Sequence, residues 1–249
     1  MQFRDHHDKT RYVNRMFGRI ASRYDWGNRV LSLGRDQSWR RRAVDMLDPT
    51  PDHWVLDVGA GTGDLSLYLA RRAGAVVALD FSQRMMGIGA DKAAKSGVQD
   101  RVCFVAADAL RLPFADDSFD GTAVAFTIRN FVSLDDGLAE IHRVLRPGGR
   151  LVCLEFTRPP SSLLNWLYQP YLKYLVPLIG GRISGDRDAY RYLAASINAF
   201  PVAEELAGAM RDAGFMKVEW RYLNMATVAI HVTHKDASPV PQPQAGTPS

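Results

Sequence analysis

Three glycines at alternate positions follow an apolar segment that contains an acid. The segment spans residues 55–58 with Asp57 inside it, and the glycines are Gly59, Gly61 and Gly63. Glycine has no Cβ, so its backbone amides can approach a ligand closely and its φ angle can become positive. Such a turn places a ligand at the N-terminus of the next helix, at the carboxyl ends of parallel strands. These residues therefore predict a site for a nucleotide-like cofactor.

The spacing of the glycines indicates which cofactor. A dinucleotide fingerprint reads G-x-G-x-x-G, whereas this chain has Asp64 where the third glycine of that fingerprint would fall. A carboxylate at this position repels a pyrophosphate but is compatible with a cationic ligand. Asp80 ends the next apolar segment, where it is placed to accept both hydroxyls of a ribose. Together with Asp57, these features resemble the S-adenosylmethionine site of class I methyltransferases; the alternative is a glycine turn without a ligand.

The elements that position these residues alternate between strands and helices. Strands are expected at 54–58, 75–80, 101–106, 120–126 and 150–156, with helices at 64–73, 83–95 and 134–145. This alternation predicts a parallel sheet covered by helices on both faces. After a helix at 202–213, two segments at 216–223 and 226–233 are expected to form an antiparallel hairpin. The predicted fold class is therefore α/β, Rossmann-like, with a mostly parallel seven-stranded sheet and a C-terminal hairpin.

Composition supports a single enzyme-sized α/β domain. The chain has 249 residues, of which 47% are hydrophobic and 23% charged. No apolar run reaches the roughly 18 residues of a membrane span, and the N-terminus is too polar for a signal peptide, so we expect a cytoplasmic protein. Cys103 and Cys153 both lie in apolar segments and are expected to be buried. The histidines show no metal-ligand spacing, so no metal site is expected.

Further motifs resemble the ubiquinone/menaquinone biosynthesis C-methyltransferase family over about residues 14–234. The matching residues are Phe17, Ala21, Tyr24-Asp25, Asn28 and Trp39-Arg40; the loop 55–64; Asp108-Ala109; Phe126 with Arg129-Asn130; and Tyr192-Leu193 with Ser196-Ile197. The glycine loop alone indicates a methyltransferase, and the remaining motifs narrow the resemblance to this family. Two positions depart from it. Ala125 stands where some members have a serine that contacts the cofactor, and Trp26-Gly27 replaces an apolar pair.

The resemblance implies methyl transfer from S-adenosylmethionine to a ring carbon of a polyprenylated hydroquinone, with demethylmenaquinol as the preferred acceptor. The corresponding benzoquinol step and methylation of another lipophilic phenol remain alternatives. A non-catalytic Rossmann-like binding protein is the alternative from a different class. Asp64 disfavours an NAD-dependent oxidoreductase, and no aromatic-proline catalytic tetrapeptide supports nucleic-acid methylation.

The resemblance and the residues together suggest roles within the site. We expect the Arg129 guanidinium, beside Asn130 at a strand end, to lower the pKa of the acceptor phenol and pair with the phenolate. Water or a nearby acid such as Asp108 would take the proton, and Tyr24 would gate the site. The predicted cofactor-binding residues are Asp57, Gly59, Gly61, Thr62, Gly63, Asp80, Phe81, Met85, Asp108 and Ala109, with Asp108-Ala109 beside the adenine.

The remaining sequence is divided into regions with different expected roles. Arginines recur every fourth residue from Arg11 to Arg23 beside an apolar face, which predicts an amphipathic helix in a basic region, 1–48, over the active site. Residues 49–235 are expected to form the methyltransferase domain, with an aromatic substrate-side insert at 160–200. Residues 236–249, rich in proline, are predicted to be a disordered tail.

The insert and the basic region suggest how a lipid substrate is met. The segment 163–179 is apolar and aromatic, and Pro170 and Pro177 exclude one straight helix. It fits a lid packed on the sheet, an apolar wall for a lipid-like substrate, or both. With the basic helix it suits transient contact with an anionic membrane, peripheral on the inner face of the cell membrane, although a solvated basic face is the alternative. No nucleic-acid partner is expected, and a homodimer is left open.

Overall fold

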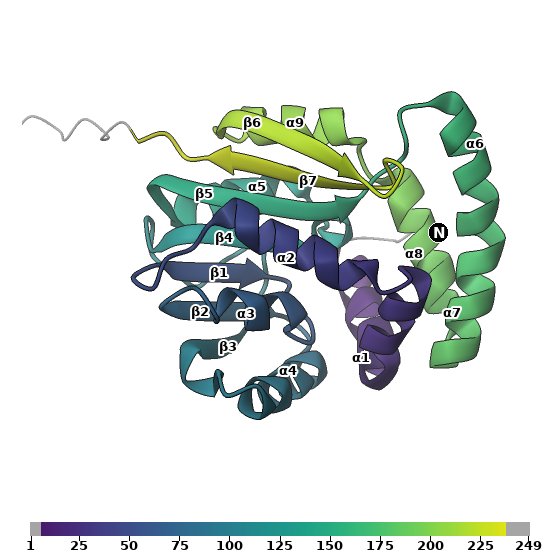
Figure 1. Ribbon diagram of the computed structural model, residues 1–249, viewed down its shortest axis with the longest axis horizontal. Coiled ribbons are helices and arrows are strands. Elements are labelled where there is room, and N and C mark those ends of the chain that lie inside the picture. The colour runs from purple at the N-terminus through teal and green to yellow at the C-terminus, as the bar shows by residue number, and fades with distance from the viewer. Residues whose placement is uncertain (1–5, 238–249) are drawn as a thin grey trace, which may run out of the picture.

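A seven-stranded sheet lies at the centre of the computed structural model, which describes residues 6–237 (Figure 1). The strands are β1 (Trp54–Val58), β2 (Ala75–Asp80), β3 (Val102–Ala106), β4 (Phe119–Ala125), β5 (Leu145–Phe156), β6 (Met216–Leu223) and β7 (Val228–His234). Their order is β3-β2-β1-β4-β5-β7-β6, with β7 antiparallel to both of its neighbours and the other pairs parallel. The predicted fold class is confirmed. The predicted tail lies almost entirely outside the described residues.

The central strands are apolar because helices cover both faces of the sheet. In β1, Val55 belongs to one buried layer, whereas Leu56 and Val58 belong to the other. Helices α2 (Arg35–Leu47) and α3 (Asp64–Leu69) supply the first layer, and α5 (Leu134–Val144) and α9 (Ala203–Asp212) supply the second. Because β1, β2, β4 and β5 are parallel, the loops that follow them emerge together at one edge of the sheet.

A third layer of helices covers this edge (Figure 1). It contains α1 (His6–Leu31), α6 (Ser162–Pro170), α7 (Val176–Ser184) and α8 (Arg187–Ala199), while α4 (Gln83–Lys95) lies beside α1. Met16 and Ile20 of α1 pack with Leu172, Val176 and Tyr190 in a separate apolar cluster. The N-terminal region and the insert thus meet over the carboxyl ends of the strands.

The insert stays helical despite its prolines. A π-helical turn, Tyr171–Leu175, joins α6 to α7. Pro170 is the last residue of α6, and Pro177 lies in the first turn of α7, where a missing N–H is tolerated. Among residues 6–237, no helix is long and apolar enough to cross a membrane.

Three local predictions were wrong, one of them the start of β5, which begins at Leu145 and not at residue 150. Helix 64–73 ends at Leu69, because the following residues turn back so that the Gly74 and Ala75 amides donate to the carbonyl of His53. Cys103 is exposed because β3 is an edge strand of the sheet, whereas Cys153 in the central β5 is buried as expected.

Candidate functional site

The glycine turn between β1 and α3 has the conformation that its sequence predicts. Gly59, Gly61 and Gly63 have φ angles of 69°, 56° and 77°, in the left-handed region that favours glycine. The Gly59 amide donates to the carbonyl of Leu79 over 2.7 Å. A Cβ at Gly59 would lie 2.0 Å from the Cγ2 atom of Thr127, so no larger residue fits there. The turn is therefore held against the ends of β2 and β4.

Two predicted cofactor acids lie under or beside this turn. Asp80 accepts from the Gly61 amide over 2.9 Å and from the Ser82 amide over 2.8 Å; burial nevertheless raises the pKa of its carboxyl. Asp57 accepts from the Ser66 hydroxyl over 2.5 Å, and burial raises the pKa of Asp57 to about 7. Asp57 also lines a small cavity beside the turn, where a bound ligand would meet it.

Helix α1 is fastened across the turn by a group of charged residues. The Thr62 hydroxyl donates to Asp25 over 2.5 Å, and the Lys92 ammonium donates to Asp25 over 3.0 Å and also to Asp64. Gln37 donates to Asp64 over 3.0 Å. Burial raises the pKa of Asp64, but Lys92 and these hydrogen bonds outweigh it and hold the pKa below its usual value. Asp64, whose carboxylate is compatible with a cationic ligand, lines the small cavity beside the turn and is paired with Lys92.

The other predicted cofactor residues lie after two strands: Phe81 and Met85 follow β2, and Asp108 and Ala109 follow β3. Met85 is buried, and its Cε atom lies 3.5 Å from the position of a Cβ on Gly61. Phe81 is half-buried against the layer that contains α1. Ala109 packs on the core, whereas Asp108 is exposed and accepts from the Leu110 amide over 2.9 Å. Asp108 does not line the larger cavity described next, so its position does not support the predicted role as proton acceptor.

A larger cavity of about 630 Å³ opens beside the turn, between the sheet edge and the outer helices. Its walls are mainly apolar, and examples are Phe17, Ile20, Phe126, Phe156, Leu172 and Ile197. The polar residues that line it include Tyr24, Tyr168, Tyr192 and Arg129. This combination suits an apolar ligand that carries an ionisable oxygen.

Arg129 lies in the wall of this cavity as half of a buried ion pair. Its Nη1 atom donates to Glu155 over 2.8 Å and also to the carbonyl of Phe126. Its guanidinium stacks 5.5 Å from the ring centroid of Phe156, and its Nε atom has no partner among the described residues. Burial raises the pKa of Glu155, and the charge of Arg129 opposes this shift. Glu155 was not predicted, because only the pairing of β4 with β5 brings it to Arg129.

The charge of Arg129 acts on the pKa of the tyrosine phenols around the cavity. Burial raises the pKa of Tyr24 and Tyr168, and raises that of Tyr192 to about 12, while the charge of Arg129 lowers each of them. A ligand phenol in this cavity would experience the charge of Arg129 and, as at Tyr192, the weaker opposing charge of Glu155. Asn130 does not line the cavity; its side-chain carbonyl accepts from the Tyr192 hydroxyl over 3.2 Å, so it supports the wall.

Tyr24 and Arg40 line both the larger cavity and the small cavity beside the glycine turn. They therefore lie at the boundary between the two cavities. Arg40 was missed as a site residue, although helical spacing places it on the buried face of α2 with Asp36 and Val44. The helical spacing of these buried residues was the signal by which the sequence could have identified Arg40 as a site residue. Among residues 6–237, no group of acidic, histidine or cysteine side chains is placed to hold a metal ion.

Comparisons with known proteins agree with this geometry. Residues 5–235 match the ubiE/COQ5 methyltransferase family. The chain is 48% identical over 220 residues to the demethylmenaquinone methyltransferase of Thermus thermophilus, covering 87% of this chain and 98% of the relative. It is 43% identical over 226 residues to the ubiquinone/menaquinone biosynthesis C-methyltransferase UbiE of Paracoccus denitrificans, covering 90% of each chain.

Similar solved structures share the fold at low sequence identity. A SAM-dependent methyltransferase from Thermotoga maritima has a TM-score of 0.62 and 21% identity, over 89% of this chain and 99% of that one. The [4+2]-cyclase SpnF has a TM-score of 0.63 and 21% identity, over 81% of each chain. Because one of these is named as a methyltransferase and the other as a cyclase, this likeness establishes the fold and leaves the chemistry to the site.

Proposed function

Because the chain belongs to the ubiE/COQ5 methyltransferase family, we propose that it methylates demethylmenaquinol at a ring carbon to give menaquinol. The family membership makes it an S-adenosylmethionine-dependent C-methyltransferase of ubiquinone/menaquinone biosynthesis. The choice of the naphthoquinol is supported by the 48% identical relative, which is named as a demethylmenaquinone methyltransferase. The corresponding benzoquinol is the second candidate, because the 43% identical relative is named for both pathways.

The residues at the glycine turn fit S-adenosylmethionine. The turn leaves no room for a Cβ at Gly59, and a small cavity lies directly beside it. When bound there, S-adenosylmethionine supplies an electrophilic methyl group on a sulfonium. Gly61, Thr62 and Asp57 line this cavity and would hold the cofactor, and Asp80 supports the turn from below.

Arg129 is the residue that supports the proposed reaction at the methyl acceptor. A ring carbon beside a hydroxyl is a weak nucleophile until the phenol ionises and moves negative charge onto that carbon. The buried guanidinium of Arg129, fixed by Glu155, would lower the phenol pKa and hold the phenolate oxygen. The apolar walls exclude water, which strengthens this interaction. Tyr24 lies between the two cavities and would orient the ring toward the cofactor side.

Quinone profiling of a deletion strain tests the reaction. We expect the strain to accumulate demethylmenaquinone, lighter than menaquinone by one methyl group, and the purified enzyme with S-adenosylmethionine to convert demethylmenaquinol to menaquinol. Accumulation of a demethylated benzoquinone precursor would assign the second candidate instead. An unchanged quinone profile, with no methylation of either quinol in vitro, would contradict both candidates.

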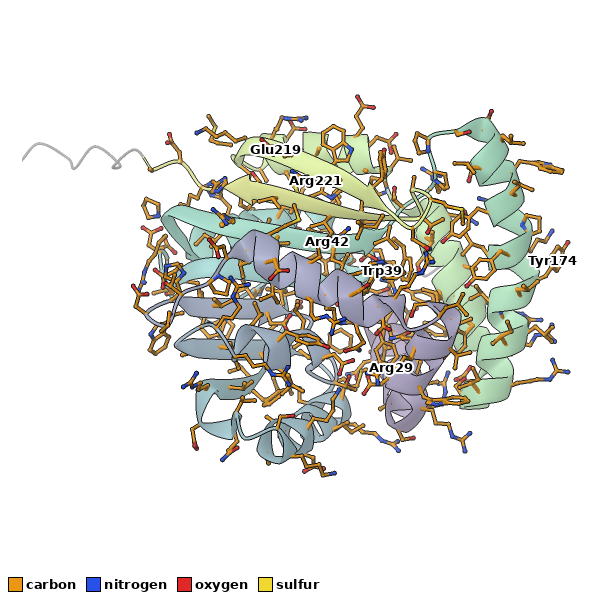
Figure 2. All side chains as sticks on the ribbon, viewed as in Figure 1. Arg29, Trp39, Arg42, Tyr174, Glu219 and Arg221 are labelled. Atoms are coloured by element: carbon orange, nitrogen blue, oxygen red, sulfur yellow. The ribbon has the colours of Figure 1, made fainter. Side chains whose placement is uncertain are left out.

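We further propose that the enzyme collects its acceptor from a membrane. Exposed apolar side chains rim the larger cavity: Leu33 is 85% exposed in the turn before α2, and Met225 is 73% exposed in the turn between β6 and β7. Leu167 and Leu175 extend the rim, and Figure 2 shows Tyr174 pointing outward from the same helical column. A bilayer in contact with this rim would deliver a polyprenyl chain directly into the cavity. The expected location is therefore peripheral, on the inner face of the cell membrane.

A further inference from the structure

Arg40 is a buried cation at the cofactor side of the site. Only 6% of the residue is exposed, and it lines the small cavity beside the glycine turn. Among the described residues that line this cavity, Arg40 is the one cation, whereas Asp57 and Asp64 are acids. The guanidinium charge of Arg40 reaches both acids, because it lowers the pKa of each against the larger effect of burial. Because Asp64 is paired with Lys92, the small cavity has the Arg40 guanidinium on one wall and the Asp57 carboxyl on another.

The orientation of the Arg40 side chain is fixed from one end. Its Nη1 atom donates to the Asp36 carboxylate over 3.1 Å and to the Asp36 carbonyl over 3.4 Å. Asp36 is itself 4% exposed and also accepts from Ser32 and Gln37. The guanidinium lies 5.2 Å from the ring centroid of Phe126. These contacts use Nη1 and the face of the guanidinium, and within residues 6–237 no hydrogen bond from Nε or Nη2 competes with a ligand.

The charges of this cavity match the amino-acid end of S-adenosylmethionine, which carries an ammonium and a carboxylate. The Asp57 carboxyl suits the ammonium, and an arginine suits a carboxylate, which it can bind through parallel hydrogen bonds. We propose that Arg40 binds the α-carboxylate of S-adenosylmethionine. This inference rests on the cofactor site proposed above and assigns to Arg40 a role in cofactor recognition. The competing role, binding an oxygen of the acceptor, arises because Arg40 also lines the larger cavity.

Calorimetry with two ligands separates these roles. S-adenosylhomocysteine keeps the carboxylate, and its decarboxylated analogue lacks only that group. We expect the wild-type protein to bind S-adenosylhomocysteine about 10- to 100-fold more tightly than the analogue, as for a charge-assisted pair. Arg40→Met should weaken binding of S-adenosylhomocysteine by a similar factor and leave the analogue's affinity nearly unchanged. Arg42→Met is the matched control, because Arg42 lies exposed on the same helix, and it should change neither affinity.

Each other outcome overturns the inference. Equal weakening of both ligands by Arg40→Met would indicate a structural role, and no weakening of either would leave the acceptor as the partner of Arg40. Arg40→Lys keeps the charge without the fork and should reduce the preference for S-adenosylhomocysteine. If Arg40→Met does not fold, Arg40→Lys replaces it in the test. An unchanged preference of Arg40→Lys for S-adenosylhomocysteine over the decarboxylated analogue would then contradict the inference. Wild-type protein that binds neither ligand would contradict the cofactor site itself.

Discussion

Among the ion pairs of the described residues, the pair of Arg129 and Glu155 is the most deeply buried. The Arg129 side chain is 4% exposed and that of Glu155 is 1% exposed, so both charges have lost their water. Replacing such a pair by uncharged residues is often neutral for stability, whereas removing one partner leaves an uncompensated buried charge. The catalytic role proposed for Arg129 predicts reduced turnover in a variant whose stability is restored, whereas a purely structural role predicts no such reduction.

We expect Arg129→Met alone to lower the free energy of unfolding by about 3–5 kcal/mol, because Glu155 stays buried without a partner. The double variant Arg129→Met/Glu155→Gln should recover most of this loss. Its turnover should still be about 100- to 1,000-fold below wild type, as when one donor to an oxyanion is removed. Urea unfolding and single-turnover assays measure the two effects. A double variant with wild-type turnover would exclude Arg129 from the chemistry.

Asp57 makes stability depend on pH in a predictable direction. Its pKa in the folded protein is about 7 and the model-compound value is 3.8, so the folded state binds the proton more tightly. This contribution to stability is complete below about pH 4 and is lost as the pH rises toward and through 7. Asp57→Asn removes it, so the variant should gain stability relative to wild type between pH 4 and pH 8, at about 1.4 kcal/mol per pKa unit. Urea unfolding without cofactor at both pH values measures the difference; a constant difference would contradict the assigned pKa.

At the scale of elements, the central strands β1 and β4 were predictable because most of their residues are buried on both faces. The segments at β1 and β2 were predicted with their observed bounds. Strand β5 begins at Leu145, five residues before the expected position, because Leu145 pairs with Phe119 across a shift in register. Periodicity cannot predict such a shift, since Pro147 and two glycines follow Leu145 and read as a turn.

The packing of the outer helices gives a prediction on α1. A Cβ at Gly27 would lie 2.2 Å from the Tyr190 hydroxyl of α8, whereas a Cβ at Gly18 of the same helix meets nothing within 4 Å. Gly27→Ala should therefore destabilise the protein by about 1–3 kcal/mol through overpacking. Gly18→Ala should stabilise it by about 0.5–1 kcal/mol, because alanine loses less backbone entropy in a helix. Thermal unfolding of both variants tests this, and equal melting temperatures would contradict the packing of α1 on α8.

At the scale of the whole molecule, the site is built from segments that are distant in sequence. Asp25 of α1 meets Thr62 of the turn and Lys92 of α4. The sequence predicted the turn because its residues are contiguous, and it predicted Arg129 because that residue follows a strand. It could not predict Lys92 or Glu155, because these residues acquire their partners only when the outer helices and neighbouring strands pack together. Sequence patterns therefore missed the ionic partners of the predicted residues, not the predicted residues themselves.

The rim of the larger cavity predicts which face of the molecule contacts a membrane. Trp166 of α6 is 70% exposed near the rim, whereas Trp54 is 55% exposed at the start of β1, at the opposite edge of the sheet. The segment 162–184 carries Lys173 and Arg182 and no acid, which favours an anionic surface. In flotation assays with anionic vesicles, Trp166→Ser should reduce the bound fraction several-fold, and Trp54→Ser should not. Bound wild-type protein should also dissociate at high salt, because salt screens the basic residues. Equal losses of binding in both variants would show that the membrane contact lies elsewhere on the molecule. No binding by the wild type would contradict a membrane contact altogether.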